Sequence, residues 1–152
     1  MKDTLIQWRN YLHANPELSW KEVETTAFIE NELRKLGIEE ILKPLETGLI
    51  AIIKGNKPHN KCIALRADID ALPIQEMNEI SYKSRQEGVM HACGHDVHST
   101  CLLGAAKRLI ENKENLGGTI KLIFQPSEEK QPSGAEAMIK AGVLVNPKVE
   151  AI

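Results

Sequence analysis

The fold class is decided by the stretch CIALRADID, residues 62–70, in which a short apolar run passes directly into two aspartates. The apolar part, residues 62–65, has strand length and no polar interruption, as does a second run at residues 49–53. Such runs are typical of strands that are buried on both faces of a sheet. The segment NKPHN, residues 56–60, predicts a turn between them. Gly117 and Gly118 predict a further turn, which leads into another strand at residues 119–124.

Segments with helical spacing of apolar residues alternate with these strands. The first helix is expected over residues 2–13, and Asn15-Pro16 is expected to terminate it. Ser19 and Glu22 fit a capping box for a second helix, and Gly37 fits its C-terminal cap. The apolar face of this second helix is predicted to consist of Val23, Ile29, Leu33 and Leu36.

Two more helices complete the pattern. The helix after residue 98 is expected to bury Cys101, Ala105 and Leu109, and a short helix is expected after Ser133-Gly134. Helices that alternate with buried strands predict an α/β sandwich around one sheet. Ligands of such sheets collect where strands end and loops begin, so polar residues at these positions are candidates for a site.

Composition excludes several classes of function. The 152 residues fit one domain, and 19 basic against 21 acidic residues give a net charge of -2, which argues against nucleic-acid binding. No stretch approaches the ~20 apolar residues of a membrane-spanning helix. The three cysteines are an odd number, and Cys62 and Cys101 are expected to be small buried residues, so a disulfide framework is not indicated. We therefore expect a reduced, cytoplasmic setting.

Three polar clusters are expected at strand ends. Asp68 and Asp70 point the same way if the extended backbone persists, although aspartates are also common in solvated turns. Glu128 and Glu129 repel each other when buried, and a cation relieves that repulsion. One carboxylate could then bind a metal while its neighbour accepts a proton from water. The alternative for the glutamates is a charged surface turn.

The remaining cluster is Cys93-Gly94-His95, flanked by His91 and His98. A thiolate and an imidazole one residue apart can reach one metal ion, and Gly94 allows the tight bend between them. The alternative is a polar loop at the start of a helix. The sequence does not fit a zinc finger, because it has no second pair of ligands at the required spacing. It does not fit a His-Glu-x-x-His site either, because no glutamate follows His91.

Four segments together resemble the amidohydrolase branch of the M20 metallopeptidase superfamily, which includes hippurate hydrolases, N-acyl-amino-acid deacylases and N-acetyldiaminopimelate deacetylase. They occur in the order typical of that branch and are LHANPE (residues 12–17), LRADIDALP (65–73), HACGHD with the following His98 (91–98) and FQPSEE (124–129). The resemblance implies a three-layer α/β sandwich with a central mixed sheet flanked by helices, the zinc-exopeptidase-like catalytic domain, here incomplete.

The resemblance also implies roles for individual residues. Cys93, His95 and Glu129 match metal ligands, and Glu128 matches the general base for a metal-activated water. Asp70 matches an acid that orients or tunes the site. Asp68 stands where other branches carry a histidine ligand, so Cys93 is expected to supply that donor. The other histidines receive no catalytic role: His13 is expected to be buried and hydrogen-bonded, and His91 and His98 to lie in an outer shell or at the surface.

The implied activity is metal-dependent cleavage of the amide bond of N-acyl amino acids of the hippurate or N-acetyl type. The donors favour Zn²⁺, with Mn²⁺, Co²⁺ or Ni²⁺ also compatible, at one or two ions per full-length subunit. The substrate is a small molecule, and the full-length parent is expected to be a homodimer with no nucleic-acid or membrane partner.

The sequence ends at Ile152 within a predicted strand, while proteins of this branch are considerably longer. We therefore expect residues 1–152 to be the N-terminal portion of a metallopeptidase-like catalytic domain, without the dimerisation (lid) domain and the C-terminal half. Two other hypotheses stay open: an inactive fragment that at most binds a metal ion, and thiol chemistry with Cys93 as nucleophile or redox centre.

Overall fold

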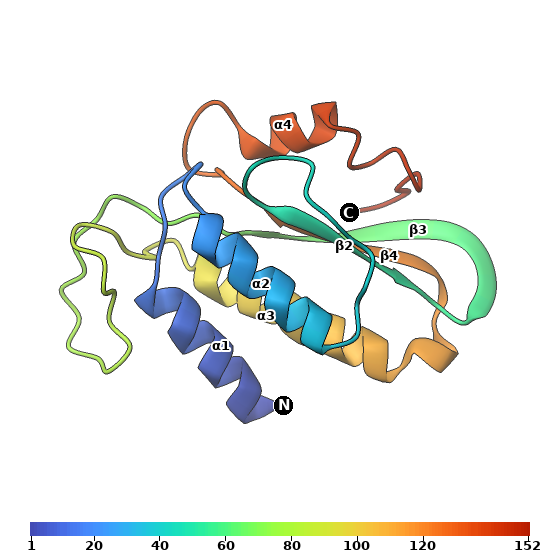
Figure 1. Ribbon diagram of the computed structural model, residues 1–152, viewed down its shortest axis with the longest axis horizontal. Helices are drawn as coiled ribbons and strands as arrows, with labels where there is room; N and C mark the ends of the chain where they lie inside the picture. The colour runs from blue at the N-terminus through green and yellow to red at the C-terminus, as the bar shows by residue number, and fades with distance from the viewer.

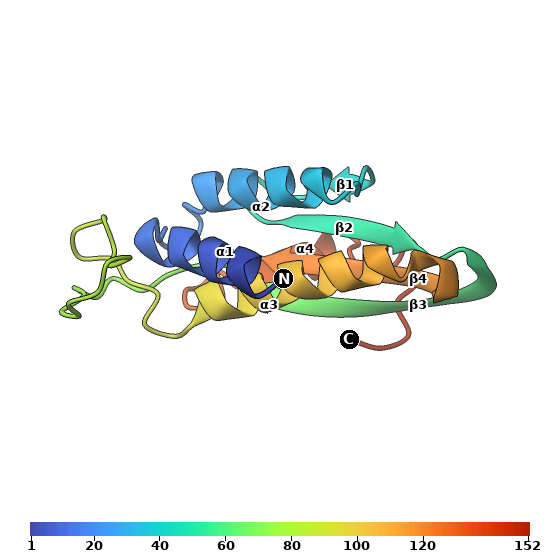
Figure 2. The same ribbon diagram turned by 90° about the horizontal axis from the view of Figure 1, so that it is seen from below.

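Three helices cover one face of a four-stranded sheet and a fourth covers the other face in the computed structural model, which describes residues 1–152 (Figures 1 and 2). This is the three-layer α/β sandwich that the sequence predicts. In chain order the elements are α1 (Lys2–Ala14), α2 (Val23–Lys35), β1 (Ile41–Leu42), β2 (Leu49–Lys54), β3 (Lys57–Asp68), α3 (His95–Glu111), the 3-10 helix η1 (Lys113–Asn115), β4 (Gly117–Gln125) and α4 (Gly134–Lys140).

The sheet is mixed, with strand order β1-β2-β4-β3. β2 is antiparallel to both of its neighbours, whereas β3 and β4 are parallel and pair from Cys62 opposite Thr119 to Asp68 opposite Gln125. Helix α3 makes the crossover that two adjacent parallel strands require. Because β3 and β4 run in the same direction, the polar residues that follow them emerge at one edge of the sheet.

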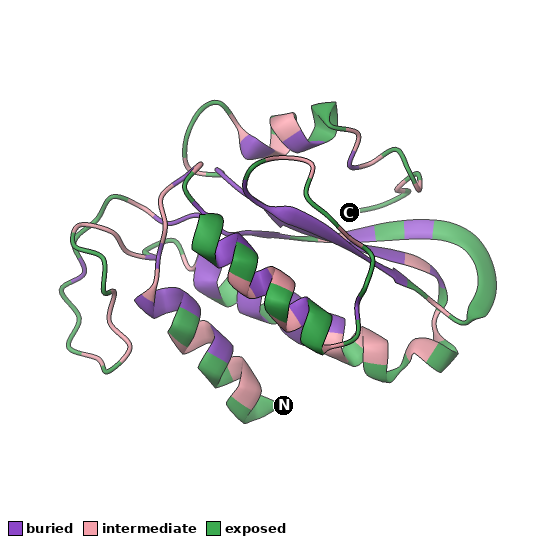
Figure 3. Ribbon diagram, in the orientation of Figure 1, coloured by how far each residue is buried: buried purple, intermediate pink, exposed green.

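The apolar runs are buried on both faces, as predicted. Along β2, Leu49, Ala51 and Ile53 belong to the main core beneath α1, α2 and α3, while Ile50 and Ile52 belong to a smaller core beneath α4. Side chains alternate between the two faces of a strand, so a strand covered on both sides has to be apolar throughout. Figure 3 shows β2 buried along nearly its whole length.

The start of α2 differs from the prediction. No side chain of the expected capping box caps this helix: the Ser19 hydroxyl donates to Asp70, and the Glu22 carboxylate accepts from the backbone N–H of Ser127. Glu17 instead accepts hydrogen bonds from the N–H groups of Glu24 and Thr25, at 3.2 and 2.7 Å. The helix ends as predicted, with Gly37 at φ +84°.

Other local predictions are also wrong. Val23 is exposed, and so is Cys101, because the buried face of α3 is formed by Leu102, Leu103 and Ala106. Strand β3 begins at Lys57, inside the predicted turn, with a register irregularity between Lys57 and Cys62. The Cys93–His95 cluster does not follow a strand; it leads into α3, which begins at His95. None of the helices is both long and apolar enough to cross a membrane.

Candidate metal centre

The site begins where the two parallel strands end. Asp68 is the last residue of β3 and pairs in register with Gln125, the last residue of β4. Asp70 lies two residues beyond the first strand, and Glu128 and Glu129 lie shortly beyond the second. The parallel register therefore brings together two acidic pairs that are far apart along the sequence.

His95 enters this edge from the first turn of α3 and is buried. Gly94 precedes it at φ +84°, a conformation that favours glycine. The Nδ1 atom of His95 lies 2.9 Å from the backbone oxygen of Asp70 and 3.1 Å from its Oδ1. A proton on Nδ1 is donated to this residue, which leaves the Nε2 lone pair free for a metal ion. Nε2 lies 3.6 Å from Asp68 Oδ1 and 3.7 Å from Glu129 Oε1.

Asp70 connects the parts of the site. Its Oδ2 accepts hydrogen bonds from the Ser19 hydroxyl at 2.7 Å and from the backbone N–H of Glu129 at 3.0 Å. Burial raises the pKa of Asp70, but its hydrogen bonds to His95, Glu129, Ser19 and Glu128 outweigh burial and hold the pKa at about 2. Asp70 is therefore an anion at neutral pH that fixes the orientation of the His95 ring.

The structure brings the three predicted ligands together. One donor atom each from Cys93, His95 and Glu129 lies within 4.8 Å of the others. Oε1 of Glu129 is shielded from solvent and has no hydrogen-bond partner, as a carboxylate oxygen would be if it served as a ligand. Sulfur, imidazole nitrogen and carboxylate oxygen together suit a borderline-soft divalent cation such as Zn²⁺. The residues present thus fit a metal ion, and their role as ligands stays a prediction.

The surroundings of Cys93 disfavour the thiol hypothesis. A hydrogen bond to Glu129, local loss of solvent and the charges of Glu129, Glu128 and Asp68 all raise the pKa of this exposed thiol. Nucleophilic cysteines need an environment that lowers the pKa, because the thiolate is the reactive form. A cation held between the sulfur and the carboxylates would reverse this effect.

A second donor group was not foreseen in the sequence. Asp68, His95 and His98 also bring one donor atom each to within 4.8 Å, and His98 Nδ1 lies 2.7 Å from Asp68 Oδ1. His95 and His98 stand three residues apart on α3, a spacing that places both rings on one face of the helix and could have indicated the pair. Arg66 lies 3.2 Å from Asp68 Oδ2 and balances part of its charge. The group with Cys93 and Glu129 contains no such cation.

The two glutamates follow a tightly held turn after β4. Ser127 is fully buried at φ +46°, a conformation rare for residues other than glycine. Its N–H donates to Glu22 Oε1 at 2.8 Å, and its hydroxyl donates to the backbone oxygen of Lys130 at 2.9 Å. Beyond this turn Glu128 is exposed, while the Glu129 side chain retains 21% exposure and is directed toward His95. The turn thus leaves the Glu128 carboxylate free and makes the Glu129 carboxylate a candidate ligand.

Two further histidines, His13 and His91, lie beside the site. His13 is buried and hydrogen-bonded as predicted, with Nδ1 2.7 Å from Asp96 Oδ2 and Nε2 3.1 Å from Glu76 Oε1. His91 is buried rather than at the surface, and neither ring nitrogen has a hydrogen-bond partner. Burial lowers the pKa of His91 to about 4.

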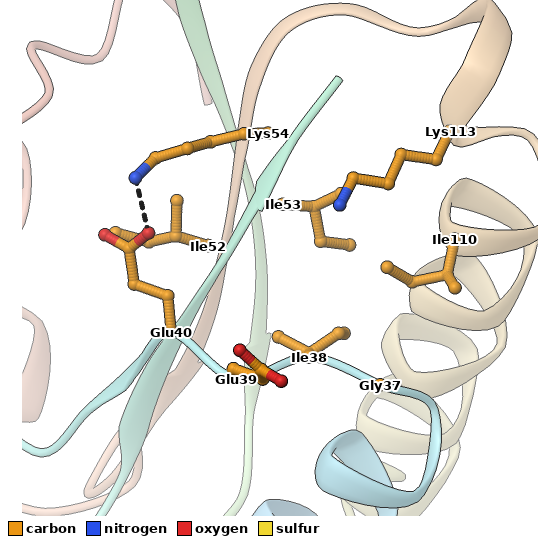
Figure 4. A pocket seen from close by; sticks show the side chains of 9 residues that line it. All are labelled: Gly37, Ile38, Glu39, Glu40, Ile52, Ile53, Lys54, Ile110 and Lys113. Carbon is orange, nitrogen blue, oxygen red and sulfur yellow. Dashed lines mark ion pairs between the residues drawn. The ribbon is translucent and has the colours of Figure 1, made fainter. Parts of the chain in front are cut away.

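A cavity at another place in the fold contains none of these residues. It lies among the end of α2, strand β2 and the end of α3, where Ile38, Ile53 and Ile110 approach one another (Figure 4). Glu40 and Lys54 form an ion pair of 2.6 Å at its rim. It brings together no group of potential metal ligands, so we exclude it from the candidate site.

A mixed sheet whose parallel strands end at clustered thiol, imidazole and carboxylate donors is the arrangement of a metal-binding α/β protein. Residues 64–152 match the profile of Peptidase family M20/M25/M40, and the chain belongs to this family. The resemblance to M20 proteins is therefore confirmed.

The chain is 51% identical to thermostable carboxypeptidase 2 of Saccharolobus solfataricus over 146 residues, covering 95% of this chain and 37% of the relative. It is 44% identical to an N-acyl-L-amino acid amidohydrolase of Geobacillus stearothermophilus over 144 residues, covering 95% and 39%. A crystal structure of a dinuclear metal-binding M20 peptidase from Bacillus subtilis superposes with a TM-score of 0.88 at 47% identity, covering 93% and 40%. The chain thus spans about two fifths of the length of these relatives.

Proposed function

We propose that the protein hydrolyses the amide bond of N-acyl amino acids with a divalent metal ion, and that residues 1–152 form the N-terminal portion of its catalytic domain. The observation that carries this proposal is the convergence of Cys93, His95 and Glu129 beside the free carboxylate of Glu128. Membership of the M20 family and the similarity to the N-acyl-L-amino acid amidohydrolase of Geobacillus stearothermophilus support this substrate class. The dimerisation (lid) domain and the C-terminal half are expected outside these residues, and a homodimer is the expected assembly.

Cys93 Sγ, His95 Nε2 and a carboxylate oxygen of Glu129 would hold the metal ion. When bound, the ion would supply a Lewis acid that polarises the amide carbonyl and lowers the pKa of water toward ~7. Zn²⁺ or Mn²⁺ is the proposed ion, with Co²⁺ or Ni²⁺ compatible and one or two ions per subunit. A second ion could draw on Asp68 and His98, which lie next to the first group.

The chain's own residues then have separate tasks. Glu128, exposed and next to the ligand Glu129, accepts a proton from the attacking water and returns it to the leaving nitrogen. Asp70 keeps a proton on His95 Nδ1 and so keeps Nε2 directed at the ligand group. It also fixes the backbone of Glu129 through that residue's N–H. Asp70 is in this sense a positioning residue.

The test combines metal binding with turnover. The protein is stripped with a chelator, titrated with Zn²⁺ or Mn²⁺, and assayed for release of the amino acid from N-benzoylglycine and N-acetyl amino acids. Glu128→Gln is expected to retain the metal and lose at least about 100-fold in kcat, within the range of a general base. Glu87→Gln is the matched control, because Glu87 is exposed and forms no ion pair.

The outcomes separate the hypotheses. Undiminished turnover by Glu128→Gln contradicts the assigned general base. Metal binding without turnover by the unchanged chain supports the alternative that these residues alone are an inactive, metal-binding piece. Turnover that survives chelation but is abolished by alkylation of Cys93 supports thiol chemistry.

A further inference from the structure

A cavity of about 450 Å³ lies directly beside the candidate metal centre. Glu129, a proposed ligand, forms part of its wall, and Lys130 follows it. Two other segments complete the lining: one holds Leu18, Ser19 and Lys21, and the other, residues 71–73, comes directly after Asp70. The lining residues are Leu18, Ser19, Lys21, Ala71, Leu72, Pro73, Glu129 and Lys130.

Asp70 forms hydrogen bonds with two of the segments that line this cavity. Its Oδ2 accepts from Ser19 on one wall and from the N–H of Glu129 on another. Leu18 and Ala71 are joined by a parallel β-bridge, and the N–H of Ala71 donates to the backbone oxygen of Glu17 at 2.8 Å. The cavity is therefore held in shape before a ligand enters, by the same carboxylate that orients His95.

The charges of the cavity favour an anion. Lys21 and Lys130 are exposed, and neither ammonium group forms an ion pair or a hydrogen bond. The one acidic side chain of the lining is Glu129, whose charge is committed to the metal in the proposed function. Next to these lysines, Leu18, Leu72 and Pro73 provide an apolar surface. A carboxylate attached to an apolar body matches this combination.

We propose that the cavity binds the amino-acid half of the substrate, with Lys21 and Lys130 receiving its free carboxylate and Leu72 contacting its side chain. This assignment rests on the proposed function, because it places the scissile amide at the ligand group that Glu129 joins. The amino-acid half of an N-acyl amino acid bears the free carboxylate, whereas a benzoyl or acetyl group is uncharged. The two unpaired lysines therefore select the orientation of the substrate.

The test measures binding by calorimetry in the Glu128→Gln background with Zn²⁺ present, so that substrate is not consumed. The probes are N-benzoylglycine and its carboxamide, N-benzoylglycinamide. Lys21→Gln and Lys130→Gln should each weaken binding of N-benzoylglycine about threefold, and the double variant about tenfold, as expected for exposed ion pairs. Binding of the carboxamide should not change. Arginine at either position should restore most of the affinity for the carboxylate.

Lys2→Gln is the control for loss of an exposed positive charge, since Lys2 lies at the start of α1, is exposed and forms no ion pair. A second arm uses Leu72→Ala. It should reduce the preference for N-acetylleucine over N-acetylglycine and leave the preference for N-benzoylglycine over N-acetylglycine unchanged.

Equal effects of the lysine variants on carboxylate and carboxamide, or no effect on either, would overturn the assignment. So would a Leu72→Ala variant that alters only the benzoyl preference, because the cavity would then hold the acyl half. Failure of the proposed function shows differently: the unchanged protein would not hydrolyse N-acyl amino acids. Binding in the Glu128→Gln background still decides the role of the lysines in that case.

Discussion

The carboxylate of Glu22 accepts a 2.8 Å hydrogen bond from the backbone N–H of Ser127, although 105 residues separate the two in sequence. Both residues are fully buried, and Ser127 adopts the positive φ from which Glu128 and Glu129 emerge. Glu22 therefore anchors the turn that carries the proposed base and one proposed ligand. A backbone conformation of this kind persists only where its surroundings impose it.

Glu22→Ala should lower the free energy of unfolding by about 2 kcal/mol, because it leaves the buried N–H of Ser127 without a partner. It should also weaken Zn²⁺ binding, since Glu129 lies two residues beyond the released turn. Urea unfolding and competition with a chromophoric chelator measure the two effects. Glu24→Ala, at an exposed glutamate two residues further along, should change stability by less than ~0.5 kcal/mol. Unchanged metal affinity in Glu22→Ala would show that the turn keeps its shape without the anchor.

Glu22 should also make stability depend on pH. Burial raises the pKa of Glu22 above its usual value of 4.5, and its hydrogen bonds offset only part of that effect. The folded state thus holds this proton more tightly than the unfolded state does. As the pH rises above the usual value, unfolding releases a proton, so the free energy of unfolding falls. The stability of Glu22→Gln relative to wild type should therefore increase from about pH 4 to about pH 8, measured by urea unfolding with chelator present. A constant difference would mean that Glu22 titrates normally in the folded protein.

Asp70 should show the opposite dependence. Its pKa of about 2 lies below the usual 3.8, because the hydrogen bonds from His95, Glu129, Ser19 and Glu128 outweigh burial. This stabilisation is complete above the usual pKa and disappears as the pH falls toward about 2. Asp70→Asn should therefore lose about 2 kcal/mol of stability at neutral pH and approach wild type in strong acid. Asp3→Asn, an exposed carboxylate on α1, is the control. Equal deficits at both pH values would contradict a depressed pKa.

The sequence predicted β2 and β4 well because their signal is local, whereas β3 begins inside the predicted turn and β1 was not predicted. Burial on both faces requires an uninterrupted apolar run, and β2 and β4 extend only slightly beyond the predicted runs. The partners of polar residues are not local. Ser19 and Glu22 have the spacing of a capping box, yet their partners Asp70 and Ser127 lie 51 and 105 residues away. Local spacing cannot distinguish a helix cap from two long-range hydrogen bonds.

The face of a helix is similarly ambiguous. The apolar spacing of α3 fits a stripe through Cys101, but packing against α1 and the sheet buries the neighbouring stripe through Leu102 and Ala106. The three predicted ligands could be grouped because the resemblance to M20 proteins assigned them together; Glu129 follows strand β4, whereas Cys93 and His95 lie at the start of α3. His98 was not among the predicted ligands because its contact with Asp68 depends on how α3 lies against β3.

Lys121 should be a strong determinant of stability although no feature of the sequence indicates it. It is buried in β4, and its ammonium group donates to the backbone oxygens of Val143 at 2.6 Å, Pro147 at 3.1 Å and Asn146 at 3.3 Å. Lys121→Met keeps the apolar stem but leaves these carbonyls without the donor, which should lower the free energy of unfolding by about 3 kcal/mol. Lys57→Met, an exposed lysine of β3, is the control in urea unfolding. Equal stability of both variants would show that water replaces the ammonium group.

The decisive prediction concerns two exposed cysteines of the same chain. Cys93 lies in the ligand group with His95 and Glu129, whereas Cys101 lies along α3 outside both donor groups. Cys93→Ser should weaken Zn²⁺ binding at least about 100-fold, because it replaces a soft thiolate ligand with a hydroxyl, whereas Cys101→Ser should leave the affinity unchanged. Replacing Zn²⁺ with Co²⁺ adds a direct readout, since a thiolate ligand gives a charge-transfer absorption band. That band should vanish in Cys93→Ser and persist in Cys101→Ser. A band that survives in Cys93→Ser would show that the metal is held elsewhere, and the proposed centre would then be wrong.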